Sequence, residues 1–355
     1  MRKLILAAVF LFAVLFLVTR TADIAQVAET FRRGAPHWLL LAIAVHLVSI
    51  LSNGAVLRAL YRALGLKEGV LRLAMLWCSA AFFTTVTSSG GWGGMAVFVA
   101  DGRKRGLPGA RVTVASAMYY LYDFVTALLV VGVGLIVLIR RGQLDPGEVL
   151  ATAVLAVYAM ILAAWLILAW RSPERLGRVL TSGGSFINRI VRPFLRRDYL
   201  DLVRARALAH DMGAGVKDLR QSPEGLILPI ALSLSQKALT IAILFLCFLA
   251  FSQPFSVGTL IAGYSLGILF TIVTPTPAGI GFVEGILTLA FTGFGIPVAT
   301  SAVIALAYRG ITLWLSLLYG MVTFRWVGLG PKPQELAAGT QQTRPIERTK
   351  TDQTR

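Results

Sequence analysis

Apolar residues fill most of this chain, in blocks long enough to cross a membrane. Eight such segments occur, at about residues 4–19, 36–57, 73–100, 112–139, 149–170, 226–250, 257–292 and 297–323. A helix needs about 20 apolar residues to cross the hydrocarbon core of a bilayer. The pattern therefore predicts an all-α integral membrane protein.

Two of these segments contain breaks in their helical pattern. The third contains SSGGWGG at 88–94, and the seventh, which is too long for one span, contains TIVTPTPAGIGFVEG at 271–285. Proline lacks an N–H group and disfavours helix at the preceding residue, whereas glycine permits tight turns. Both segments are predicted to be re-entrant hairpins. Their tips would be formed by Ser88, Ser89, Gly90, Gly91, Gly93 and Gly94, and by Pro275, Pro277, Gly279 and Gly281.

The charges of the polar stretches favour this arrangement. Residues 58–72 and 101–111 each carry a net charge of +3, and residues 171–225 hold eleven basic against six acidic residues. Basic loops face the cytoplasm. All strongly basic stretches fall on one side only if segments 73–100 and 257–292 return to the side they entered. The charges thus predict about six spanning helices, two hairpins and two cytoplasmic termini.

The order of spans and hairpins is the same in both halves, but the two halves start on opposite sides. This predicts an inverted repeat within a membrane domain at 1–325, with halves at about 1–140 and 149–325. Between the fifth and sixth segments, the basic loop 171–225 is either an amphipathic helix on an anionic leaflet or a plain cytoplasmic loop. The polar tail at 326–355 is predicted to be disordered.

Composition excludes a soluble globular domain. The chain is 56% hydrophobic and 14% charged, with a mean hydropathy of +0.74, whereas soluble domains carry about 25% charged residues. The net charge of +17 fits membrane topology better than nucleic-acid binding. The two cysteines lie in apolar runs, the three histidines are scattered, and no nucleotide-binding or catalytic motif occurs. We therefore expect no metal and no cofactor, and an enzyme is the less favoured class.

Four ionisable residues lie deep within the apolar segments: Asp123, Lys237, Glu284 and Arg309. Such residues are expensive in a bilayer and by default mark a pathway or a pair. One interpretation is two neutral pairs that hold the bundle together, and the other is a lipid head-group or proton-coupling site. A helix is expected to begin near Gly281 with Glu284 in its first turn, so that its N-terminus favours an anion at mid-depth.

Polar residues at helical spacing accompany three of these segments and indicate faces turned to an interior cavity. The stripes consist of Tyr119, Tyr122 and Asp123; of Ser233, Gln236, Lys237 and Thr240; and of His46, Ser49 and Asn53, with Arg58 just beyond. We expect His46 to be satisfied within the bundle.

These residues resemble the family of lysylphosphatidylglycerol synthase transmembrane regions, also called flippase-like or UPF0104 membrane proteins, over nearly all of residues 1–325. The most specific piece is PTPAGIGFVEG, similar to the family's Pro-x-Pro-Gly-Gly-x-Gly-x-x-Glu, with Ala278 where glycine is usual. Supporting pieces are NGAVLRALYRALG with Asn53 and Arg58, the SSGGWGG break, Asp123, and YRGITLWLSLLYG with Tyr308, Arg309 and Gly320. The family often has an acidic–arginine pair just before its aspartate, where this chain has Tyr119-Tyr120-Leu121-Tyr122.

In larger members, a soluble C-terminal domain makes an aminoacyl lipid and the membrane region moves it. The resemblance therefore implies a lipid translocase in the cytoplasmic membrane of a bacterium or archaeon, without aminoacyl transfer. Anionic or polyprenyl-phosphate lipids are the implied partners, since stand-alone members are linked to isoprenoid-lipid, hopanoid or glycolipid pathways. Two alternatives stay open: a membrane-embedded transferase of lipid-linked sugars, and a scaffold or accessory of a partner enzyme of lipid or glycolipid synthesis.

Overall fold

The computed structural model describes residues 29–87, 92–142 and 224–326, except Phe31, Arg33 and Pro275, together with isolated positions between 153 and 171. The described residues form helices and contain no strand. Several predictions lie outside them: those for segment 4–19 and nearly all of segment 149–170, for Ser88, Ser89, Gly90, Gly91 and Pro275, for nearly all of the basic loop 171–225 and for the tail 326–355 beyond its first residue.

Helices follow one another in the order of the apolar segments. They are α3 (Pro36–Ala63), α4 (Val70–Thr87), α5 (Trp92–Lys104), α6 (Gly109–Arg140), α10 (Glu224–Ala250), α11 (Val257–Val273), the 3-10 turn η1 (Pro277–Gly279), α12 (Phe282–Gly293), α13 (Val298–Arg309), the π-helical segment η2 (Gly310–Trp314) and α14 (Leu315–Trp326). Within the described ranges, five helical stretches are long and apolar enough to cross a membrane: α3, α4, α6, most of α10, and the continuous run α13–η2–α14. The chain is a multi-pass helical membrane protein, and α11 and α12 are shorter apolar helices.

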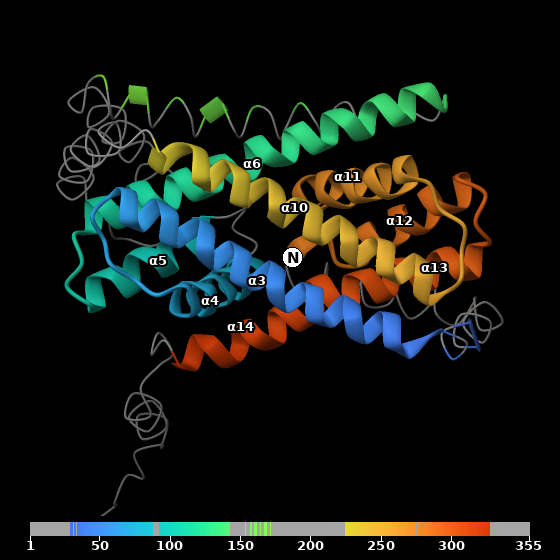
Figure 1. Ribbon diagram of the computed structural model, residues 1–355, viewed down its shortest axis with the longest axis horizontal. Coiled ribbons are helices and arrows are strands. Elements are labelled where there is room, and N and C mark those ends of the chain that lie inside the picture. Colours follow the sequence, from blue (N-terminus) through green and yellow to red (C-terminus); the bar gives the residue numbers. More distant parts are fainter. Residues whose placement is uncertain are drawn as a thin grey trace, which may run out of the picture.

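Helices α3 and α10 run side by side through the middle of the bundle (Figure 1). The α4–α5 pair lies toward one end of the long axis, and the α11–α12 pair lies toward the other. Helix α14 packs along α4, and α6 packs along α11. Each interrupted segment is therefore flanked by a long helix from the other half of the chain.

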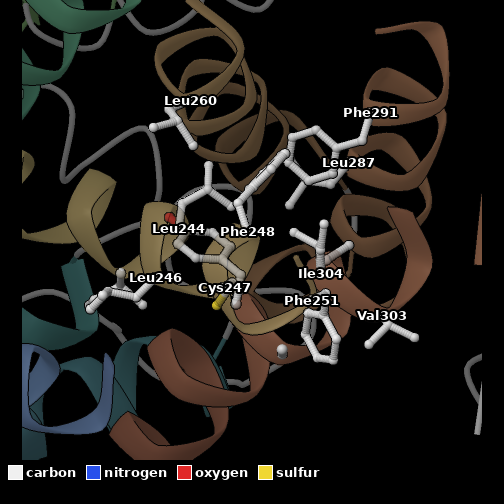
Figure 2. Close-up of a cluster of buried hydrophobic side chains, with 14 of the residues drawn as sticks. Leu244, Leu246, Cys247, Phe248, Phe251, Leu260, Leu287, Phe291, Val303 and Ile304 are labelled. Atoms are coloured by element: carbon white, nitrogen blue, oxygen red, sulfur yellow. The ribbon is translucent and has the colours of Figure 1, made fainter. Parts of the chain in front are cut away.

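Each half of the bundle has its own apolar core. Leu57, Phe98 and Val114 are fully buried in the first, and Phe248 and Phe291 are fully buried in the second (Figure 2). The outer surface is apolar as well, since many large side chains on the long helices are exposed. In a bilayer such side chains contact lipid, so helix association depends on close packing and on internal polar contacts.

Helix α3 extends beyond its predicted apolar segment. The prediction ended at residue 57, whereas the helix continues to Ala63. Leu60 and Tyr61, in this extra part, are buried against the first core. Tertiary packing thus carries the helix through a stretch that its basic residues marked as a loop, and it places Arg58 inside a helix.

Ion pairs join the outer ends of the α4–α5 pair. Arg72 donates to the Asp101 carboxylate at 2.7 Å, and Arg105 contacts the Glu68 carboxylate at 2.7 Å. Both carboxylates are nearly buried, while both guanidinium groups are more than a third exposed. These ion pairs thereby link the beginning of α4 to the end of α5.

Close helix approach depends on glycine at two contacts between the halves of the chain. A Cβ atom at Gly320 of α14 would lie 2.5 Å from the Cys78 carbonyl oxygen of α4. A Cβ atom at Gly134 of α6 would lie 2.2 Å from Ser265 Oγ of α11. Both distances are far shorter than van der Waals contact, so only glycine fits without a shift of the neighbouring helix.

We predict that Gly320→Ala lowers the free energy of unfolding of the purified protein by about 1–3 kcal/mol, because the added methyl group overpacks a backbone contact. Gly132→Ala is the matched control, since a Cβ there meets nothing within 4 Å and alanine raises helix stability by up to about 1 kcal/mol over glycine. Denaturant titration in detergent measures both. Equal stabilisation by the two substitutions would contradict the packing described.

Candidate functional site

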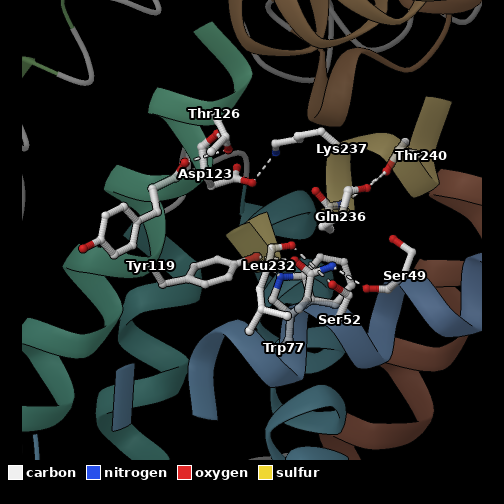
Figure 3. Close-up of polar contacts among 12 residues, drawn as sticks. Ser49, Ser52, Trp77, Tyr119, Asp123, Thr126, Leu232, Gln236, Lys237 and Thr240 are labelled. Carbon is white, nitrogen blue, oxygen red and sulfur yellow. Dashed lines mark hydrogen bonds and ion pairs between the residues drawn. The ribbon is translucent and has the colours of Figure 1, made fainter. Parts of the chain in front are cut away.

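An ion pair joins α6 to α10 inside the bundle. Lys237 of α10 reaches across to the Asp123 carboxylate of α6 in a short hydrogen bond (Figure 3). The lysine side chain is 5% exposed and the aspartate side chain is 30% exposed. The pair is therefore asymmetric: the cation is enclosed, while part of the carboxylate lies on an accessible surface. Removing either partner of a buried pair leaves an uncompensated charge and typically costs about 3–5 kcal/mol.

One turn away from Asp123, a tyrosine connects three helices. Tyr119 of α6 donates its hydroxyl proton to Asn53 Oδ1 of α3 at 2.7 Å, and Trp77 of α4 donates its indole N–H to the same hydroxyl (Figure 3). Asn53 in turn donates to the Ser49 carbonyl at 3.0 Å. Every polar atom of this chain of contacts has a partner within the protein, as buried polar groups require, so it fixes α3, α4 and α6 relative to one another.

Further polar contacts line the interface between α3 and α10. Ser52 Oγ lies 3.5 Å from Ser235 Oγ and 3.4 Å from the Leu232 carbonyl oxygen. Gln236 donates to Thr240 at 3.2 Å, but its Oε1 atom is buried and has no partner among the described residues. The polar stripes predicted on α3, α6 and α10 thus lie toward one another in the middle of the bundle.

The second interrupted segment forms a sharp turn between α11 and α12. Ala278, Gly279 and Gly281 have positive φ angles of 50°, 71° and 84°. This left-handed region is easy for glycine and unusual for alanine. Helix α12 begins after Gly281, and Glu284 in its first turn accepts the Gly281 N–H at 2.8 Å. The predicted helix start near Gly281 is confirmed.

Arg309 fastens this turn to α13. Its Nε atom donates to Glu284 Oε1 at 3.0 Å, and its Nη2 atom donates to the Ala278 carbonyl oxygen at 2.6 Å. The glutamate bridges two groups, because its second oxygen accepts the Gly281 N–H. With 9% exposure for the arginine side chain and 14% for the glutamate side chain, the pair is almost enclosed. One guanidinium therefore satisfies both a carboxylate and a backbone carbonyl at a break in the apolar segment.

A local change of helix type follows Arg309. Gly310–Trp314 form a π-helical segment before α14 begins. Such single-turn insertions often occur at functional positions. Here the insertion separates the arginine from the part of the helix that packs on α4, so each part can keep its own contact register.

The remaining predicted site residues have different surroundings. Tyr308 is buried in the second apolar core. His46 Nε2 lies 3.1 Å from Ser316 Oγ, so it is satisfied inside the bundle as expected. The Nε atom of Arg58 is buried without a partner among the described residues. Of the tip residues, Gly93 and Gly94 lie in the first turn of α5 and Pro277 begins η1.

Four ionisable residues predicted from the sequence thus form two pairs, Asp123–Lys237 and Glu284–Arg309. Residues absent from the prediction complete the contacts: Trp77, Ser316 and the Ala278 carbonyl group. Trp77 was detectable only as one aromatic residue in an apolar run, and a backbone carbonyl leaves no trace in a sequence. Among the described residues, no cluster of three or more His, Cys, Asp or Glu could hold a metal ion.

Comparison with known proteins identifies the family of this chain. Residues 4–320 match the family described as lysylphosphatidylglycerol synthase TM region. The chain is also 21% identical over 310 residues to a UPF0104 membrane protein of Methanothermobacter thermautotrophicus, an alignment that covers 85% of this chain and 89% of the relative. With helices that span a membrane and a family match over most of its length, the chain belongs to the lysylphosphatidylglycerol synthase transmembrane-region family.

Proposed function

We propose that this protein is a lipid translocase that moves a polar-headed, anionic lipid across the membrane. The observation that carries the proposal is the Glu284–Arg309 pair at a break in an apolar segment, where one arginine holds both a carboxylate and a backbone carbonyl. Irregular backbone at membrane depth is tolerated only against protein or beside a polar cavity. Beside such a cavity, an arginine can bind a phosphate in place of its carboxylate partner.

The inverted repeat with two re-entrant hairpins that the sequence predicts would fit this proposal, because that design recurs in secondary transporters. Helix α6 packs on α11 as α14 packs on α4, and each contact is made through a glycine. In the proposed repeat, positions correspond by their place in the helix: Gly94 and Glu284 are the third residues of α5 and α12, and Tyr120 and Arg309 are the twelfth residues of α6 and α13.

The two hairpin ends differ at these equivalent positions. A Cβ atom at Gly94 would lie 2.0 Å from the Tyr120 hydroxyl oxygen, so a neutral ring occupies the space that a side chain on α5 would need. At the other end, Glu284 and Arg309 fill the equivalent positions with opposite charges. We infer that the end of the first hairpin is uncharged and keeps its conformation. The end of the second hairpin carries the charges that bind a head group.

The Asp123–Lys237 pair is a second polar contact site for a head group that crosses the protein. It bridges the halves of the repeat, because Asp123 lies on α6 and Lys237 on α10. The partly exposed carboxylate suits a cationic group or a coupling proton, and the enclosed lysine suits an anion that displaces the carboxylate. A head group could thus pass between two ion pairs while its acyl chains stay in lipid.

Reconstituted vesicles test the proposal with a labelled anionic phospholipid and a labelled polyprenyl phosphate. We expect Glu284→Gln to slow the movement of the transported probe at least tenfold, because no carboxylate then returns to Arg309 to displace the bound phosphate. Glu68→Gln is the matched control, since it also removes a nearly buried carboxylate from an ion pair with arginine. This pair lies at the outer ends of α4 and α5. Folded wild-type protein that moves no probe would favour the transferase or accessory interpretation.

A paired substitution separates function from stability at the second ion pair. We predict that Lys237→Met alone destabilises the protein by about 3–5 kcal/mol, because Asp123 loses its cation. The double substitution Lys237→Met with Asp123→Leu restores most of that stability, since apolar replacements of a buried pair are often neutral or stabilising. Both variants are expected to lose the lipid movement of the wild type. Wild-type movement by the stable double variant would assign the pair a structural role only.

A further inference from the structure

Two threonine hydroxyls at the hairpin ends lack the hydrogen bond that their neighbours make. Thr85 and Thr87 of α4 donate to the Ala81 and Phe83 carbonyl groups at 3.0 and 2.7 Å. This bond to the carbonyl four residues earlier is the usual arrangement for threonine in an apolar helix. The Oγ1 atom of Thr84, in the same turn, is buried and has no partner among the described residues.

The second hairpin repeats this difference. Thr274, at the end of α11, donates to the Phe270 carbonyl oxygen at 2.6 Å. Thr276, two residues later, precedes η1 and has a buried Oγ1 atom without a partner in the described part of the chain. A buried hydroxyl without a hydrogen bond is costly, and most such groups in proteins have a partner. Two exceptions at equivalent breaks therefore call for a common ligand.

These two hydroxyls belong to elements that meet. Helix α4, which carries Thr84 in its last turn, packs against η1, which follows Thr276 directly. The hydroxyl of Thr84 points toward the facing helix of its own hairpin, because its oxygen lies 2.9 Å from the position of a Cβ atom at Gly94. Both hydroxyls therefore lie on the protein side of the hairpin ends and away from lipid.

A guanidinium group lies at the turn that follows Thr276. Arg309 donates to the Ala278 carbonyl, two residues after Thr276. Its contacts to Glu284 and Ala278 use two of the five N–H groups of a guanidinium, and the described residues provide no further partner. Hydroxyl donors beside a guanidinium with free N–H groups match the acceptor-rich, negatively charged oxygens of a phosphate ester.

We propose that Thr84 and Thr276 are specificity-determining contacts of a phosphate-ester site between the two hairpin ends, with Arg309 as its cation. The site takes the phosphate of a phospholipid or polyprenyl-phosphate head group and rejects lipids with a neutral head. This inference rests on the proposed function, and it adds two phosphate-binding residues that no motif marked and the rejection of lipids with a neutral head.

Equilibrium binding to the full-length protein in detergent tests this site apart from any transport. The probes are a short-chain phosphatidylglycerol, a diacylglycerol with the same chains and no phosphate, and inorganic phosphate. Native mass spectrometry or a thermal-shift titration measures binding. We expect the phosphatidylglycerol to bind and the diacylglycerol to bind at least tenfold more weakly, whereas competition by millimolar inorganic phosphate would assign the site to the phosphate group alone.

Valine keeps the shape of threonine and removes its hydroxyl group. We expect Thr84→Val and Thr276→Val each to weaken phosphatidylglycerol binding about tenfold, the usual effect of one hydrogen bond to a charged group. Neither substitution is expected to lower the unfolding midpoint of the protein, because each removes a buried hydroxyl group that has no hydrogen-bond partner among the described residues. Thr85→Val and Thr274→Val are matched controls from the same two hairpins, and they leave the affinity within twofold of wild type.

Two results would overturn the proposal. Equal affinities of Thr84→Val and Thr85→Val would mean that the Thr84 hydroxyl serves bound water only. Equal binding of the diacylglycerol would mean that the phosphate is not recognised. Either result leaves the translocase proposal standing if the wild type still moves lipid in vesicles, whereas absence of lipid movement with intact phosphate-dependent binding would overturn the translocase proposal alone.

Discussion

Satisfying polar groups in a hydrocarbon environment is the constraint on which this structure depends. A break in an apolar segment exposes backbone N–H and carbonyl groups, and each such group left unpaired in lipid costs several kcal/mol. At the second hairpin, Glu284 accepts a hydrogen bond from the Gly281 N–H. Arg309 donates hydrogen bonds to both Glu284 and the Ala278 carbonyl oxygen. The charged pair thus makes the break tolerable, and the same pair gives the break a ligand-binding character.

The middle of the bundle follows the same constraint with different chemistry. Asp123 and Lys237 neutralise each other between α6 and α10, while Tyr119 donates its hydroxyl proton to Asn53 Oδ1 between α6 and α3. Polar contacts of this kind position the helices, because apolar surfaces gain little by associating within lipid. Both ion pairs therefore have a structural role, and the proposed transport uses groups that the fold already requires.

Much of this arrangement could be predicted from the sequence. The apolar helices of the described residues, the break after residue 274 and the helix start near Gly281 follow from proline, glycine and hydrophobic pattern. The choice of partners could not be predicted, because Asp123 and Lys237 are separated by 114 positions and either acid could in principle have met either base. Likewise, no local pattern distinguishes Thr84 from Thr85, since only the packing of α4 against η1 decides which hydroxyl bonds its own helix.

The central claim is that the polar contacts between α3, α6 and α10 line a route for a head group and are not a sealed core. The most direct measurement is the reaction of Gln236→Cys with a membrane-impermeant thiol reagent in vesicles of both orientations, after replacement of the two buried cysteines, Cys78 and Cys247. Lys67→Cys, in the exposed loop before α4, is the reference for one-sided access. A route predicts reaction at Gln236→Cys from each side of the membrane; reaction from neither side, with normal reaction at Lys67→Cys from one side, would contradict the claim.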